Sequence, residues 1–338
     1  MAPLFARAAA FFQRHPVLLL LALTPGIPEY LSGSTKTSLL VLDPPAFLLF
    51  LALNLGLYGP GVLLVRESWV RGGRSWGALL LFGIAYALLE EGTALSTLFN
   101  PSPGVVASLG VYGRAGGVNW LWTVGVIGFH IVFSVGLPIV LFGLALPTWR
   151  GRPLLARPGI AIAAAVFVAD IGVLAASEHY YTVQPAWILG AAVVAGVLWV
   201  VALRRPAGWL DPPGELPTGG PRFYGALGFV VFPVLILLPS FGEAVGLPAA
   251  ATIAIDLGFG LGLFLAVRGT VGRRANEAAL VALAFGATLP LVGWGLASQI
   301  SVPVVLAFDV LWALFFYALW DRYRPRTALT SVPSGSPI

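Results

Sequence analysis

Long apolar runs recur along this chain, and most are about as long as a helix must be to cross a bilayer. They lie roughly at residues 17–31, 45–65, 76–97, 119–143, 158–177, 185–203, 222–242, 248–268, 276–297 and 301–320. A transmembrane helix needs about 20 predominantly apolar residues. Only 10% of the residues are charged, against roughly 25% in a typical soluble domain. The sequence therefore predicts an all-α, polytopic integral membrane helical bundle of about ten transmembrane helices.

The first apolar run differs from the others because it is short and interrupted by Pro25 and Pro28. With Arg7 and Arg14 upstream, it is similar in layout to the core of a signal peptide. No small-x-small cleavage motif follows it, so we expect an uncleaved first transmembrane span.

The basic residues predict how the bundle is oriented. With the N-terminus inside, seventeen of the nineteen fall in cytoplasmic segments, and only Lys36 and Arg114 lie outside. The seventeen are Arg7, Arg14, Arg66, Arg71, Arg74, Arg150, Arg152, Arg157, Arg204, Arg205, Arg222, Arg268, Arg273, Arg274, Arg322, Arg324 and Arg326. Cytoplasmic loops of membrane proteins carry such an excess. We therefore expect both termini in the cytoplasm, a location in the plasma (inner) membrane, and no nucleic-acid partner despite the net charge of +5.

A Pro- and Gly-rich segment suggests how the chain is divided. We expect an N-terminal six-helix membrane region at 1–203, a cytoplasmic loop at 204–221, a C-terminal four-helix membrane region at 222–322, and a disordered tail at 323–338.

Ionisable residues at membrane depth are the candidates for function. They are Glu90, Glu91, His130, Asp170, Asp256 and Asp309, and no Lys or Arg lies at the same depth. Each buried charge costs roughly 2.5–3.5 kcal/mol on insertion scales, so such residues usually mark a functional site. The chain has no cysteine, which excludes thiolate catalysis, disulfides and cysteine-ligated metal sites.

Helical spacing predicts which of these groups face inward. Neighbouring residues in an α-helix point about 100° apart, so Glu90 and Glu91 should face different surfaces. Glu90 shares a polar stripe with Tyr86, which makes it the inward candidate and leaves Glu91 at the interface or behind it. Polar residues at helical intervals also mark two neighbouring spans: Asn54 and Tyr58 on one, and Asn119, Thr123, His130 and Ser134 on the other.

The first functional hypothesis is binding or transport of a small solute linked to a proton or a cation. Carboxylates and a histidine without internal cations create a negative site, as in proton relays. The expected binding residues are Glu90, His130, Asn54, Asp170, Asp256 and Asp309. The expected partners are the lipid bilayer and a small solute or cation. No organic cofactor is expected, whereas a divalent cation stays open because imidazole and carboxylates together bind metals.

A second hypothesis comes from a resemblance. The Glu90–Glu91 pair, followed by His130 in the next span, resembles the CAAX-protease and bacteriocin-processing (CPBP) intramembrane glutamate proteases. The resemblance covers residues 90–134 and implies that Glu90 or Glu91 activates water while His130 assists. The chain departs from the family pattern at Leu95, where the family has Arg, and at Val126, where it has an aromatic residue.

The third hypothesis is a non-catalytic membrane scaffold subunit, whose polar groups only join helices. Isosteric replacement of Glu90 or Asp256 would then change stability alone. The sequence leaves these three hypotheses open.

Overall fold

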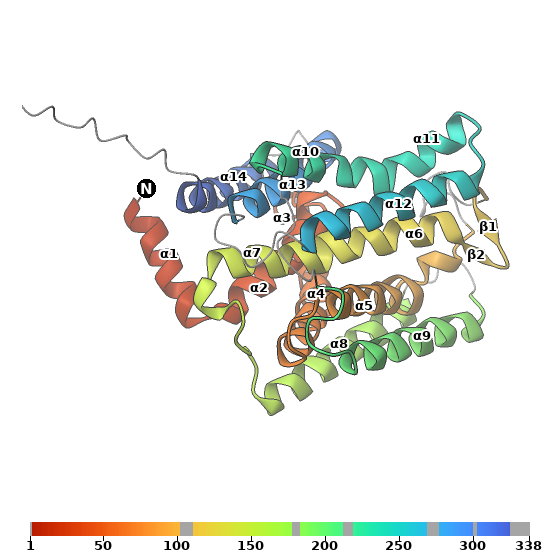
Figure 1. The fold of residues 1–338 in the computed structure, drawn as a ribbon, viewed down its shortest axis with the longest axis horizontal. Helices are drawn as coiled ribbons and strands as arrows, with labels where there is room; N and C mark the ends of the chain where they lie inside the picture. The colour runs from red at the N-terminus through yellow and green to blue at the C-terminus, as the bar shows by residue number, and fades with distance from the viewer. Residues whose placement is uncertain are drawn as a thin grey trace, which may run out of the picture.

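A computed structural model describes residues 2–101, 111–177, 183–211, 219–268, 277–299 and 303–324 (Figure 1). Most of the expected disordered tail at 323–338 lies outside these residues, as do 212–218 of the expected loop at 204–221. The division of the chain into four regions stays a prediction.

The described part of the chain is almost entirely helical. Its α-helices are α1 (Ala2–Arg14), α2 (Pro16–Pro25), α3 (Leu39–Leu42), α4 (Pro44–Arg71), α5 (Trp76–Ala87), α6 (Trp120–Phe129), α7 (Leu137–Ala145), α8 (Arg157–Ser177), α9 (Pro185–Leu203), α10 (Pro221–Phe232), α11 (Leu238–Ala244), α12 (Ala249–Arg268), α13 (Glu277–Gln299) and α14 (Pro303–Tyr323). Two 3₁₀ turns, Thr97–Phe99 and Pro147–Trp149, and a hairpin of β1 (Arg114–Ala115) with β2 (Val118–Asn119) complete it.

Four π-helical segments extend or join these helices. Gly26–Leu31 continues α2, Leu88–Ala94 continues α5, His130–Gly136 joins α6 to α7, and Pro233–Leu237 joins α10 to α11. A π-helix bonds each residue to the fifth along the chain and usually occurs as a single turn, frequently at a functional site.

Nine helical stretches of the described residues are long and apolar enough to cross a bilayer. They are Pro44–Arg71, Trp76–Ala94, Trp120–Ala145, Arg157–Ser177, Pro185–Leu203, Pro221–Ala244, Ala249–Arg268, Glu277–Ala297 and Val304–Tyr323. A tenth stretch, Pro16–Leu31, is apolar but shorter. The prediction of an all-α polytopic membrane bundle is confirmed.

Short polar side chains fix where the central helices begin. Asp43 accepts a hydrogen bond from the Ala46 N–H (3.1 Å), Ser75 from the Ala78 N–H (3.0 Å), and Asn119 from the Trp122 N–H (3.0 Å). Each bond satisfies one of the N–H groups that the first turn of a helix leaves without a partner. The starts of α4, α5 and α6 are therefore set by local sequence.

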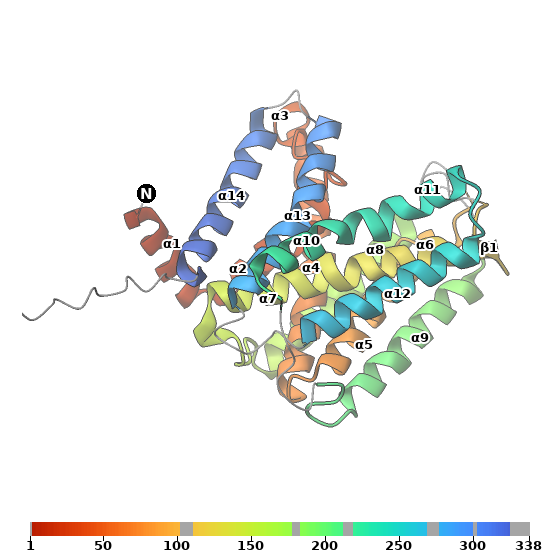
Figure 2. The same cartoon turned by 45° about the horizontal axis from the view of Figure 1, so that its top comes forward.

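The helices differ strongly in how far the rest of the protein covers them. In the most apolar stretch of Trp76–Ala94, 67% of the residues are buried, against 17% in each of α8, α9, α12 and α14. Figures 1 and 2 show α12 running alongside α6, with α14 on the side of the bundle away from α8 and α9. The polar residues of α5 and its π-helical extension therefore lie in the interior of the bundle.

Helices α10 and α13 approach each other unusually closely. A Cβ atom on Gly228 would lie 2.1 Å from the Leu283 carbonyl oxygen, and one on Gly286 would lie 2.1 Å from the Gly225 carbonyl oxygen. Small residues let helix backbones come together in membranes, where packing rather than the hydrophobic effect drives association.

A buried ion pair holds the C-terminal end of α4 in place. The side chain of Arg66 is only 1% exposed and donates to the carbonyl oxygens of Trp149 (2.5 Å) and Arg152 (3.0 Å). Its neighbour Glu67 lies 3.2 Å from the Arg66 guanidinium and accepts a bond from the Leu154 N–H (2.6 Å). These contacts tie α4 to the connection between α7 and α8.

Contacts also join the first part of the chain to the last. The Ser38 N–H donates to the Gln299 side chain (3.2 Å), and a Cβ on Gly295 would lie 2.4 Å from the Leu31 carbonyl oxygen. Helix α13 therefore packs directly against the π-helical segment Gly26–Leu31.

Candidate functional site

Three glutamates and the intramembrane histidine lie in π-helical segments. Glu29 belongs to Gly26–Leu31, Glu90 and Glu91 to Leu88–Ala94, and His130 to His130–Gly136. A π-helical turn is wider than an α-helical turn, so it changes which neighbouring side chains share a face. Three such turns bring their polar groups into one region of the bundle.

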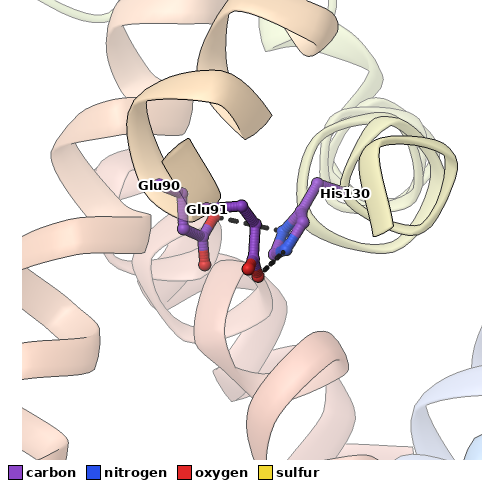
Figure 3. A group of neighbouring side chains, drawn as sticks. All are labelled: Glu90, Glu91 and His130. Carbon is purple, nitrogen blue, oxygen red and sulfur yellow. Dashed lines mark hydrogen bonds and ion pairs between the residues drawn. The ribbon is translucent and has the colours of Figure 1, made fainter. Parts of the chain in front are cut away.

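Glu90, Glu91 and His130 form a compact buried cluster (Figure 3). The imidazole lies between the two carboxylates: Nε2 is 2.8 Å from Glu91 Oε1, and Nδ1 is 3.1 Å from Glu90 Oε2. Nδ1 also lies 2.8 Å from the Ser134 hydroxyl, one turn along the same helix. One atom from each of the three residues lies within 4.8 Å of the other two.

Glu90 is the least satisfied member of this cluster. Its side chain is 0% exposed, and neither carboxylate oxygen has a hydrogen-bond partner of good geometry among the described residues. His130, Tyr58 and Tyr86 lie close enough to interact with Glu90 electrostatically and through side-chain hydrogen bonds of poorer geometry. A buried carboxylate with unused acceptor capacity is costly, which makes Glu90 the group with most to gain from a bound cation.

Glu91 is held more firmly. Its Oε2 accepts a hydrogen bond from the Thr97 hydroxyl, and Thr97 in turn accepts one from the Trp122 indole N–H (3.0 Å). The chain therefore clamps Glu91 between His130 and the 3₁₀ turn that follows its own helix.

A third carboxylate lies beside the cluster. Glu29 accepts hydrogen bonds from the Tyr58 hydroxyl (2.7 Å) and from the Thr35 hydroxyl (2.7 Å), and Asn54 donates to Thr35 (2.9 Å). The Tyr58 ring stacks against His130, with ring centroids 6.5 Å apart. Glu29 is close enough to interact electrostatically with both Glu90 and His130.

Among the described residues, no hydrogen bond or ion pair joins the predicted aspartates to the cluster, and their membership of one site stays a prediction. Asp170 on α8 packs against α4, where a Cβ on Gly56 would lie 2.5 Å from its Oδ1. Asp256 on α12 is 1% exposed and belongs to the wall of a separate cavity of about 540 Å³. Asp309 on α14 has an Oδ2 without a hydrogen-bond partner.

The cavity beside Asp256 is otherwise apolar. Its walls come from α5, α6, α7, α10, α12 and α13 and from two π-helical segments, with residues such as Leu79, Val124 and Leu283. Ile131 and Val132 also line it, and they follow His130 directly. One π-helical segment therefore presents His130 to the acidic cluster and its next residues to the cavity.

The expected separation of Glu90 and Glu91 is wrong. Glu91 is 6% exposed and contacts the same imidazole as Glu90. Neighbouring residues diverge in the π-helical turn as well, but both side chains reach the imidazole because Glu90 meets its Nδ1 and Glu91 meets its Nε2. The pairing of His130 with Ser134 follows the predicted polar face.

Glu29 is not among the predicted binding residues. The signal that could have identified it is the interruption by Pro25 and Pro28 directly before it, since helix breaks at membrane depth commonly line a binding site.

Comparisons with known proteins place the chain in a family without giving it an activity. No curated protein and no solved structure matches the chain. The resemblance to CPBP proteases gains no support from these comparisons. Residues 18–321 match the profile of a family described as an uncharacterized membrane protein family. That match covers most of the chain, and the protein is therefore a member of this uncharacterized membrane protein family.

Proposed function

We propose that this protein binds a proton or a cation at the Glu90–Glu91–His130 cluster and couples that binding to transport of a small solute. The proposed location is the plasma (inner) membrane, with both termini in the cytoplasm.

The balance of buried charge carries this proposal. Glu90 and Glu91 flank a single imidazole, Glu29 is close enough to interact with it electrostatically, and in the described part of the chain no Lys or Arg forms an ion pair with any of the three. Protonating His130 would offset one negative charge at most. A buried anion without a counter-charge costs several kcal/mol, so the cluster favours uptake of protons or of a cation.

The adjoining cavity is the proposed position of the solute. A volume of about 540 Å³ falls within the roughly 300–1,000 Å³ typical of small-molecule sites. Its apolar wall and the buried carboxylate of Asp256 suit a largely apolar molecule with a positive charge or a hydrogen-bond donor. The shared segment His130–Gly136 offers a direct physical link between cation uptake and the shape of this cavity.

The test is the melting temperature of the purified protein in nanodiscs, measured across pH and with added Na⁺, K⁺, Mg²⁺ and Zn²⁺. A ligand that binds only the folded protein raises the melting temperature by mass action. We expect a cation-dependent rise that Glu90→Gln removes. Glu243→Gln at the end of α11 is the matched control and should behave as wild type. Identical curves for wild type and Glu90→Gln across all conditions would contradict the proposal.

Intramembrane hydrolysis is the second candidate, favoured by the contact of one imidazole with two glutamates. Glu90, with an unused carboxylate oxygen, is placed to accept a proton from water, and His130 is placed to orient that carboxylate. Cleavage of a fluorogenic transmembrane peptide that both Glu90→Gln and His130→Ala abolish would favour this candidate. If neither cation binding nor cleavage depends on Glu90, the scaffold hypothesis is the one left.

A further inference from the structure

We infer that the Glu90–Glu91–His130 cluster is a site for a divalent first-row transition-metal ion of the Zn²⁺ or Co²⁺ class. This inference rests on the proposed function, because it names the cation that the cluster takes up.

The spacing of the donor atoms suits a metal ion. Two ligands bound to one ion at about 2.0–2.2 Å with tetrahedral angles lie roughly 3.5 Å apart. The imidazole nitrogens lie 2.8 and 3.1 Å from the carboxylate oxygens, and one atom from each residue lies within 4.8 Å of the other two. The two short distances involve different ring nitrogens, so coordination by one nitrogen and two carboxylate oxygens requires the imidazole or a carboxylate to rotate.

The unused bonding capacity of Glu90 points to a ligand rather than to a closed structural pair. Its side chain is completely buried, directed toward Glu91 and His130 (Figure 3), and without a hydrogen bond of good geometry among the described residues. Structural carboxylates of this protein look different. Glu67 is just as deeply buried, yet it contacts Arg66, Arg71 and the Leu154 N–H.

Charge balance favours a divalent ion over a monovalent one. A divalent ion bound by a neutral imidazole offsets both Glu90 and Glu91, whereas Na⁺ or K⁺ would leave one carboxylate uncompensated. The third carboxylate, Glu29, has its own hydrogen bonds from Tyr58 and Thr35, so it needs no share of the metal.

The donor types favour a transition metal over Mg²⁺ or Ca²⁺. Those hard cations prefer sites made of oxygen ligands alone, whereas imidazole suits Zn²⁺, Co²⁺ and their neighbours in the first row. Three protein ligands also leave a coordination position for water or solute, as in catalytic rather than structural zinc sites. The Ser134 hydroxyl, 2.8 Å from Nδ1, is placed to hydrogen-bond the imidazole or a water molecule there.

Support from neighbouring residues fixes the orientation of two of the three ligands. Thr97 donates to Glu91, and Tyr58 stacks on His130. Such outer contacts commonly orient metal ligands and strengthen binding. Glu90 is the ligand left free to close onto the ion.

The experiment is a Co²⁺ titration of EDTA-stripped protein in nanodiscs of zwitterionic lipid, followed by visible absorption. Co²⁺ bound to nitrogen and oxygen ligands in a site of low coordination number gives intense bands that aqueous Co²⁺ lacks. We expect one Co²⁺ per chain, displacement by Zn²⁺, and no displacement by Mg²⁺, Ca²⁺ or Na⁺. Glu90→Gln should weaken binding by about 100-fold or more, while Glu243→Gln keeps the wild-type affinity.

Three outcomes would overturn the inference: no Co²⁺ bands with wild type, equal binding by wild type and Glu90→Gln, or equally effective displacement by Mg²⁺. The melting temperature of each variant in EDTA shows whether that variant is folded. If Glu90→Gln is unstable, the Co²⁺ titration is repeated with Glu90→Asp, which keeps the negative charge. If protons or Na⁺ stabilise wild type through Glu90 while Co²⁺ and Zn²⁺ do not bind, the proposed function stands and the metal inference fails.

Discussion

Glu67 and Glu90 are both almost completely buried, but they differ in their ion pairs and hydrogen bonds. Glu67 has a counter-charge and a backbone donor, whereas Glu90 has an ion-pair contact with His130 and no hydrogen bond of good geometry among the described residues. The first arrangement holds the chain together. The second leaves free energy to be gained from a ligand.

Replacing Glu67 should therefore damage the fold. We expect Glu67→Ala to lower the free energy of unfolding by about 3–5 kcal/mol, because it leaves the buried guanidinium of Arg66 uncompensated. Arg71→Ala is the matched control. Its side chain is 42% exposed, so losing this second contact to Glu67 should cost about 1 kcal/mol or less. Denaturant titration in micelles would measure both, and equal effects would show that the pair with Arg66 is not the anchor.

The candidate site could be recognised from single residues only in part. Charge at membrane depth identified Glu90 and His130, and four-residue spacing joined His130 to Ser134. Helical spacing assigned Glu91 to another surface, because it follows the direction in which a side chain starts and does not show that two diverging carboxylates can meet opposite edges of one imidazole. The grouping of Asp170, Asp256 and Asp309 with the cluster stays a prediction, because nothing in a sequence reports which helices are neighbours.

Among the helices, the transmembrane spans were predictable and the π-helical turns were not. A transmembrane span is recognisable in a sequence as about twenty apolar residues. The N-terminal capping residues of α4, α5 and α6 are Asp43, Ser75 and Asn119, which are residue types common at that position. A π-helical turn results from one inserted residue in an otherwise continuous helix, and it leaves hydropathy unchanged. The segments that carry the acidic cluster were therefore the hardest to foresee.

The contact between α10 and α13 provides a test of helix packing. Gly286→Ala should separate the two helices, because its Cβ would lie 2.1 Å from the Gly225 carbonyl oxygen. Such overpacking typically costs about 1–3 kcal/mol. Gly258→Ala on α12 is the matched control, since a Cβ there meets nothing within 4 Å, and it should be neutral or stabilising by up to about 1 kcal/mol. A thermal melt of the two variants that showed no difference would count against close packing of α10 on α13.

For the complete bundle, the expected orientation can be tested without background labelling because the chain contains no cysteine. Lys36 and Arg205 are both exposed, and the distribution of basic residues assigns them to opposite sides. In intact cells, a membrane-impermeant maleimide should label Lys36→Cys and should reach Arg205→Cys only after permeabilisation. The reverse pattern would invert the topology and place the loop at 204–221 outside.

The π-helical turn Leu88–Ala94 also has a consequence for the history of the family. Losing one residue there would restore an ordinary helix, leave the flanking parts in place and shift only the side chains of the turn itself, which include Glu90 and Glu91. Glu90 and Glu91 could then no longer meet His130 together. The extra residue and the acidic pair should therefore be gained or lost together, so relatives without the pair should carry a one-residue gap at this turn.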